Sequence, residues 1–186
     1  MNIADIISKS AVLDNVQAAS KRELVQSLSE HIAALSGLDE RAVFDAVWER
    51  ENLGSTGYGE GVAFPHARIE GLEKVCGMFA RLEEPVDFDS LDGKPVDLVF
   101  MLISPENSGA DHLTALAALS RILKTEGSCD KLRKARSTDE IYAILNDVKK
   151  NKYSAPVYIA GAFFYKVFFV QSLFLYAELL LHIKVF

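Results

Sequence analysis

The sequence predicts an α/β fold, because helical segments and short apolar segments alternate along the chain. Two helix-type segments precede, and two follow, a pair of apolar segments rich in Val, Phe and Met. With 186 residues and 49% hydrophobic content, the chain is long enough for one substantial core but hardly for two. We therefore expect one globular unit with appendages.

The first elements are predicted to be two amphipathic helices. A capping-box pattern at Ser20–Glu23 begins the first helix, whose apolar residues recur every three or four positions until about Leu35. Asp39 is a suitable N-cap for a second helix that ends near Glu51. This assignment places Arg50 at the C-terminal end of the second helix.

A glycine-rich segment follows, with four glycines between positions 54 and 61, and it predicts a loop. Backbone amides of such a loop can surround an anion, and two hydroxyl groups could add further donors. The candidate phosphate-binding residues are Gly54, Ser55, Thr56, Gly57, Gly59 and Gly61. Residues 62–65 then predict a short strand that ends at a proline, with His66 at its tip.

The second half of the chain is predicted to hold two interior strands and two helices. Residues 75–82 and 96–103 are short, apolar and rich in Val, Phe and Met, so both suit interior strands covered on both faces. Capping-box patterns beginning at Ser108 and Ser137 then open two amphipathic helices. His112 is expected in the first turn of the earlier one.

Composition excludes several classes of function. Residues 151–186 carry a net charge of +2 out of a total of −6, so residues 1–150 form an acidic unit of −8 that repels a phosphate backbone. No nucleic-acid partner is therefore expected. Cys76 and Cys129 have no metal-ligand or redox-motif spacing and are expected to be free thiols in a reducing compartment.

Several interpretations of His66 remain open from the residues alone. It could be a structural histidine with satisfied hydrogen bonds, or a metal ligand together with His112, although no third ligand falls at a typical spacing. The glycine-rich loop lacks the Gly-Lys-Ser/Thr ending of a nucleotide P-loop. No G-x-S-x-G elbow supports a serine hydrolase either. We expect neither a metal nor a cofactor.

The segment Arg50–His66 resembles the phosphorylation-site signature of the mannitol/fructose-type IIA family of the bacterial phosphotransferase system, and most of all its nitrogen-regulatory branch. The segments Pro85–Phe100 and His112–Leu116 agree with this family, so the resemblance spans roughly residues 1–150. Departures are mild. Tyr58 and Phe64 stand where the family usually has aliphatic residues, and Ala67 stands where it often has glycine.

The resemblance implies a mixed sheet of about five strands flanked by helices, with His66 as the phosphoacceptor. It further implies that His112 is the second active-site histidine and that Arg50 is the basic group beside them. A neutral imidazole can act as the nucleophile, while a guanidinium can bind phosphate oxygens. Without the resemblance, the preferred interpretation of Arg50 is a helix-end side chain that neutralises the C-terminal carbonyl groups and Glu49 or Glu51.

The resemblance also implies protein partners: a phosphorylated HPr-like carrier as the phosphoryl donor, and either a IIB domain or regulated proteins downstream. In the first case the chain is a sugar-transport transferase subunit, and in the second it is a regulatory module switched by phosphorylation. The absence of attached IIB or IIC domains favours regulation. A degenerate domain that is never phosphorylated is a third alternative, disfavoured because His66, His112 and Arg50 are all retained.

Residues 151–186 do not belong to this pattern and are expected to form an atypical hydrophobic tail. Six of the eleven phenylalanines lie within residues 157–186, where only Lys166, Glu178 and Lys184 are charged. This segment could associate with a membrane, pack or form an oligomer contact, or arise from a shifted reading frame. The N-terminus, Met-Asn-Ile-Ala-Asp, has no basic region followed by an apolar region and so does not resemble a secretory signal, and we expect residues 1–150 to be cytoplasmic.

Overall fold

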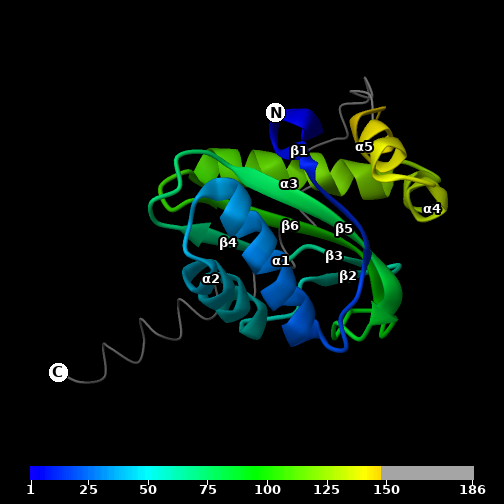
Figure 1. The fold of residues 1–186 in the computed structure, drawn as a ribbon, viewed down its shortest axis with the longest axis horizontal. Coiled ribbons are helices and arrows are strands. Elements are labelled where there is room, and N and C mark those ends of the chain that lie inside the picture. The colour runs from blue at the N-terminus through cyan, green and yellow to red at the C-terminus, as the bar shows by residue number, and fades with distance from the viewer. Residues whose placement is uncertain (148–186) are drawn as a thin grey trace. The chain divides into compact units, whose positions relative to one another are not determined.

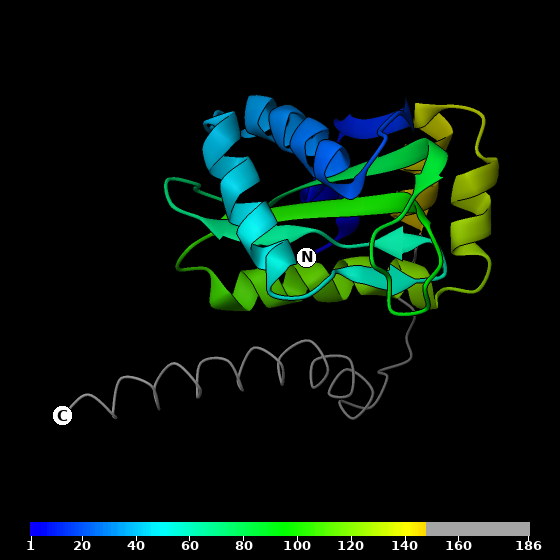
Figure 2. The same ribbon diagram turned by 90° about the horizontal axis from the view of Figure 1, so that it is seen from below.

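A computed structural model describes residues 1–147 of the chain, and the predicted hydrophobic tail at 151–186 lies outside the described residues. Within this range, helices cover both faces of a six-stranded mixed sheet (Figures 1 and 2), which confirms the predicted α/β class and flanked mixed sheet. No helix in residues 1–147 has the length and apolar character needed to cross a membrane.

The elements follow one another without long interruptions. The strands are β1 (Ile7–Val16), β2 (Gly57–Gly59), β3 (Val62–Ala63), β4 (His66–Ile69), β5 (Cys76–Val86) and β6 (Val96–Pro105). The helices are α1 (Lys21–Ser36), α2 (Glu40–Asn52), α3 (Gly109–Lys124), α4 (Ser128–Lys134) and α5 (Thr138–Asp147), and a 3₁₀ turn, η1 (Ile3–Asp5), precedes β1.

Strand β6 organises the sheet. It pairs antiparallel with β5 on one side and parallel with both β3 and β4 on the other. Outside these, β1 pairs parallel with β5, and β2 pairs antiparallel with β3. Residues 98–104 of β6 are buried, as predicted for a strand covered on both faces.

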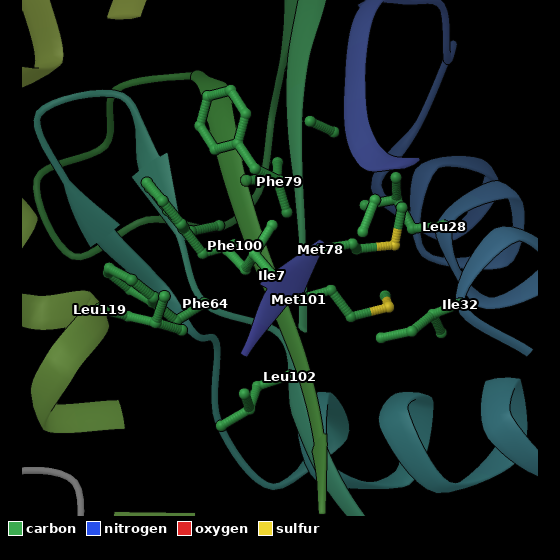
Figure 3. Close-up of a cluster of buried hydrophobic side chains, with 14 of the residues drawn as sticks. Ile7, Leu28, Ile32, Phe64, Met78, Phe79, Phe100, Met101, Leu102 and Leu119 are labelled. Atoms are coloured by element: carbon green, nitrogen blue, oxygen red, sulfur yellow. The ribbon is translucent and has the colours of Figure 1, made fainter. Parts of the chain in front are cut away.

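Two layers of side chains enclose the sheet. Helices α1 and α2 lie over one face and α3 lies over the other (Figure 2). Figure 3 shows Phe79 and Phe100 on the α3 side, with their ring centroids 4.9 Å apart, whereas Met78 and Met101 extend towards α1. Side chains alternate between the two faces along a strand, so every second residue of β6, counted from Phe100, faces α3.

The helix boundaries agree with the predicted caps at α1 and α2 but not at α3. The Ser20 hydroxyl accepts from the Glu23 amide, and the Asp39 carboxylate accepts from the Ala42 amide. Gly37, with φ of 74°, then ends α1 in the left-handed conformation. Ser108 is the N-cap of α3 by position, but its hydroxyl donates to the Pro105 carbonyl and caps no amide.

The prediction that His66 ends a strand of residues 62–65 is corrected by the structure. β3 stops at Ala63, and His66 is the first residue of β4. Both short strands keep the same register along β6, with Ala63 opposite Val99 and His66 opposite Leu102. The interruption falls at Phe64 and Pro65, where proline has no amide hydrogen to donate to the sheet.

Strand β2 lies within residues 54–61, which were predicted as a loop, so that prediction is wrong for Gly57–Gly59. β1 and α4 also had no predicted counterpart, and one arginine ties both to the sheet. The Arg81 guanidinium on β5 forms two hydrogen bonds of 2.7 Å to the carboxylate of Asp14 on β1. Its Nη1 also donates to the carbonyls of Leu132, Arg133 and Ala135 at the end of α4. This bidentate contact lowers the pKa of Asp14, with burial acting in the opposite direction.

Replacing Arg81 should therefore loosen the sheet edge and α4 together. We expect Arg81→Met to lower the free energy of unfolding by about 2 to 3 kcal/mol, because it leaves a largely buried carboxylate and three carbonyls without their donor. Urea denaturation measures this change. The exposed Arg136 offers a matched control, since Arg136→Met should change stability by less than about 0.5 kcal/mol. Equal effects of the two substitutions would contradict the assigned role of Arg81.

Candidate functional site

The two predicted histidines lie next to each other, although 46 positions separate them in the sequence. Their ring centroids are 5.4 Å apart and the ring planes are inclined by 51°. β6 brings them together: Leu102 lies opposite His66 in the parallel register, and Ser104, two residues further along β6, contacts His112. The pair therefore sits on the α3 side of the sheet.

The half-buried His66 ring has one nitrogen fixed by the backbone. Its Nδ1 lies 2.8 Å from the carbonyl oxygen of Phe64. A carbonyl can only accept, so Nδ1 carries the hydrogen of the neutral ring and Nε2 carries the lone pair. His66 thus presents Nε2 as its nucleophilic atom.

His112 lies in the first turn of α3, as predicted, and is buried with 6% of its surface exposed. Its Nδ1 lies 2.7 Å from the hydroxyl oxygen of Ser104, which is fully buried. A hydroxyl can donate or accept, so this contact orients the ring while allowing the proton to occupy either nitrogen. His112 is therefore held in place but remains able to exchange hydrogen-bonding roles.

Arg50 occupies the last turn of α2, as predicted. Its Nη1 donates to the carbonyl of Gly54 at 3.1 Å, which lies just beyond the end of α2. Its Nε, however, is buried and has no hydrogen-bond partner among the described residues. Burial lowers the pKa of Arg50, and Glu51 acts against this effect. The guanidinium thus retains donor capacity that an anion could satisfy.

Burial and nearby positive charge keep both histidines neutral. Burial lowers the pKa of His66 to about 3, and the positive charge of Arg50 adds to this effect. The pKa of His112 falls to about 4 through burial and then through Arg68 and Arg50. A neutral imidazole retains the lone pair that a nucleophile needs. At neutral pH the site therefore combines nucleophilic rings with a positive surrounding.

The glycine-rich segment is anchored by the carboxylate of Glu51, a buried residue with 4% of its surface exposed. This carboxylate accepts from the amide and the hydroxyl of Thr56 and forms a 2.9 Å ion pair with Lys21 of α1. The Ser55 hydroxyl donates to the carbonyl of Phe88 and accepts from the amide of Gly57. Both hydroxyls predicted as phosphate donors therefore donate within the protein.

Two glycines of this loop are required by close packing. A Cβ atom at Gly57 would lie 2.6 Å from the Ser90 hydroxyl, and one at Gly61 would lie 2.6 Å from Asp97. Gly61 also has a φ of 78°, which side chains rarely adopt. Packing thus accounts for glycine at these positions without a ligand. The binding of phosphate by loop residues 54–61 remains a prediction.

Two residues near the histidines were missed by the sequence analysis. Arg68 follows His66 by two positions on β4, so strand alternation could have placed both side chains on one face. Ser104 ends the apolar run of β6, and a polar residue there was the available signal. Its partner, His112, is eight residues further along the chain and could be identified only from the fold.

The other candidate ligands do not gather at this site. Within residues 1–147, no three His, Cys, Asp or Glu side chains are grouped as a metal ion would require. Cys76 and Cys129 are free and half-buried, as expected, and burial raises the pKa of both thiols. His31 is exposed on α1, with Nδ1 near the carbonyl of Ser27.

The lowered pKa values predict a characteristic pH response. Between about pH 4 and 6.5, the unfolded chain binds protons that the folded site excludes, so stability should rise with pH in this interval. For the buried His112, the loss at about pH 4.5 relative to pH 7 amounts to about 2 kcal/mol. Urea denaturation at both pH values should show a smaller difference for His112→Gln than for the wild type. An unchanged difference would contradict the lowered pKa.

Comparisons with known proteins identify the family of the chain. The family model described as phosphoenolpyruvate-dependent sugar phosphotransferase system, EIIA 2, matches residues 5–148. A nitrogen regulatory protein of Bradyrhizobium diazoefficiens is 47% identical over 145 residues, which cover 78% of this chain and 95% of the relative. A fructose-specific EIIA component of Haloferax volcanii is 38% identical over 131 residues, which cover 70% of this chain and 85% of the relative.

A solved structure shows the same relationship. The crystal structure of nitrogen regulatory protein IIA-Ntr from Neisseria meningitidis superimposes with a TM-score of 0.73 at 38% identity, covering 77% of this chain and 98% of that one. The chain therefore belongs to the EIIA type-2 family of the phosphoenolpyruvate-dependent sugar phosphotransferase system, and its relatives include nitrogen-regulatory IIA proteins.

Proposed function

We propose that this chain is a cytoplasmic phosphohistidine carrier that accepts a phosphoryl group on Nε2 of His66. The observation that carries the proposal is the 2.8 Å contact between His66 Nδ1 and the Phe64 carbonyl, which leaves the lone pair on Nε2. The pKa of about 3 supports it, because the ring stays neutral at physiological pH. We assign this role to a domain of residues 1–150.

The donor would be the phosphohistidine of a phosphorylated HPr-like carrier protein. As the Nε2 lone pair of His66 forms the new P–N bond, the P–N bond of the donor breaks and its electron pair returns to the donor imidazole. No proton is gained or lost in this exchange. The protein contributes chiefly by positioning the reacting atoms and by stabilising the negative charge of the phosphoryl oxygens.

We assign Arg50 and His112 the role of stabilising the negative charge of the phosphoryl oxygens. The unpartnered Nε of Arg50 can donate to a phosphoryl oxygen, which would satisfy a buried donor as well as neutralise charge. His112 lies within 5.4 Å of the His66 ring, centroid to centroid, and in the first turn of α3. A hydrogen bond from its ring to the phosphoryl group would add to the favourable field at the start of the helix.

We propose a regulatory role downstream, in which phosphorylation of His66 changes how the protein binds its targets. The 47% identity to a nitrogen regulatory protein favours this assignment. The alternative is a sugar-specific IIA subunit that passes the phosphoryl group to a IIB domain, and the 38% identity to a fructose-specific EIIA component keeps it open. Both roles use the same His66 chemistry and differ only in the protein that contacts it next.

The phosphoacceptor assignment predicts a specific loss of phosphorylation. With phosphoenolpyruvate, the general phosphotransferase proteins and the full chain, the wild type should acquire acid-labile phosphate, whereas His66→Ala should acquire none. His31→Ala removes an exposed histidine on α1 and should behave as the wild type. Intact-mass measurement at neutral pH quantifies the label, and labelling of His66→Ala at the wild-type level would refute the assignment.

Arg50 and His112 should affect the rate rather than the existence of the reaction. We expect Arg50→Ala and His112→Ala each to slow phosphoryl transfer by about ten- to a hundredfold, because each removes one donor from the developing phosphoryl charge. Rapid-quench kinetics measure the rate, and circular dichroism verifies folding. Wild-type rates in both folded variants would remove their assigned roles.

The downstream acceptor can be identified by offering the phosphorylated chain a fructose-type IIB domain with its sugar permease. A regulatory protein should transfer phosphate to this domain much more slowly than a sugar-specific IIA measured in parallel. Efficient formation of sugar phosphate would instead favour the transport role.

A further inference from the structure

Arg68 is the second positive side chain beside the histidines, and none of the assignments above gives it a role. It lies two residues after His66 on β4, and its register partner on β6 is Ser104, the residue that holds His112. Residues two apart in a strand are about 6.5 to 7 Å apart along it, and neighbouring strands are about 5 Å apart. The backbone of Arg68 is thus close to His66 and to Ser104, which contacts the His112 ring.

The Arg68 side chain shares the face of the sheet that carries the histidines. Along β4 the buried residues Ala67 and Ile69 alternate with His66 and Arg68. Laterally paired residues point to the same face, and Ser104 points towards α3, where its hydroxyl contacts His112. Arg68 therefore emerges on the α3 side, exposed to solvent next to the two rings.

Among the described residues, Arg68 forms no hydrogen bond or ion pair, so its guanidinium is not engaged in holding the fold. Arg81 and Arg133, by contrast, bind carboxylates and carbonyls through several nitrogens. Even so, the charge of Arg68 reaches the site. It contributes more than Arg50 to lowering the pKa of His112, and it also lowers that of His66.

We propose that Arg68 is a phosphate-binding residue of this site, whose guanidinium donates to oxygens of the phosphoryl group on His66 and so favours the phosphorylated state. This inference rests on the proposed function and adds a second arginine to it. The guanidinium fork suits tetrahedral phosphate oxygens, and Arg50 approaches from a different element, the end of α2. Two cations on separate elements match a dianionic group better than one.

Binding of inorganic phosphate tests Arg68 without requiring phosphoryl transfer. Titration of the full chain is followed through the imidazole ¹H–¹⁵N signals of His66 and His112. We expect Arg68→Gln to raise the Kd for phosphate by about three- to tenfold, as for an exposed charge-assisted contact. Arg68→Lys should recover part of this loss, because lysine keeps the charge but lacks the fork.

Arg121→Gln is the matched control, because it makes the same change in net charge at an exposed position of α3. Nine residues beyond His112, it lies about 13 Å further along the helix. The proposal is overturned if Arg68→Gln and Arg121→Gln change the Kd equally, or if phosphate leaves the histidine signals of the wild type unmoved.

A second measurement is the equilibrium of phosphoryl exchange with the phosphorylated HPr-like carrier. Arg68→Gln should shift this equilibrium towards the carrier by a similar factor of about three to ten relative to Arg121→Gln. An unshifted equilibrium overturns the inference for Arg68 while leaving the role of His66 intact. If the wild type accepts no phosphoryl group at all, the proposed function fails, and the phosphate titration still decides whether Arg68 binds phosphate.

Discussion

The fixed register of β6 is the constraint on which the rest of the structure depends. Its central residues are buried on both faces, so a slip by one position would exchange its core-facing side chains between the two helical layers. That register places Leu102 beside His66 and, two residues later, directs Ser104 to His112. The distance between the two imidazole rings therefore depends on the packing of β6 in the hydrophobic core.

The site combines two features that oppose each other energetically. Burial and two arginines disfavour a proton on either ring, which costs stability as the pH falls but keeps the imidazoles nucleophilic at neutral pH. The same positive surroundings would favour the phosphorylated state. The buried ion pair between Glu51 and Lys21 anchors the adjoining loop and helix α2, and so holds the residue next to Arg50 in place.

Local patterns in the sequence were sufficient for α1, α2 and the two central strands, because capping residues and apolar runs act over a few neighbours. They placed Arg50 and His112 correctly on their helices. β1 was not predicted, since its apolar residues are interrupted by polar ones and its pairing partner, β5, is distant in the sequence. The strand position of His66 was wrong for a similar reason: only pairing with β6 shows that a strand resumes after Pro65.

The central claim is that the Phe64 carbonyl selects the reactive nitrogen of His66. Long-range ¹H–¹⁵N correlation spectra of the ¹⁵N-labelled, phosphorylated protein, with ³¹P coupling, identify the atom bonded to phosphorus. The account predicts phosphorus on Nε2 of His66, with Nδ1 still protonated against the carbonyl. Phosphorus on Nδ1 of His66, or on either nitrogen of His112, would contradict it.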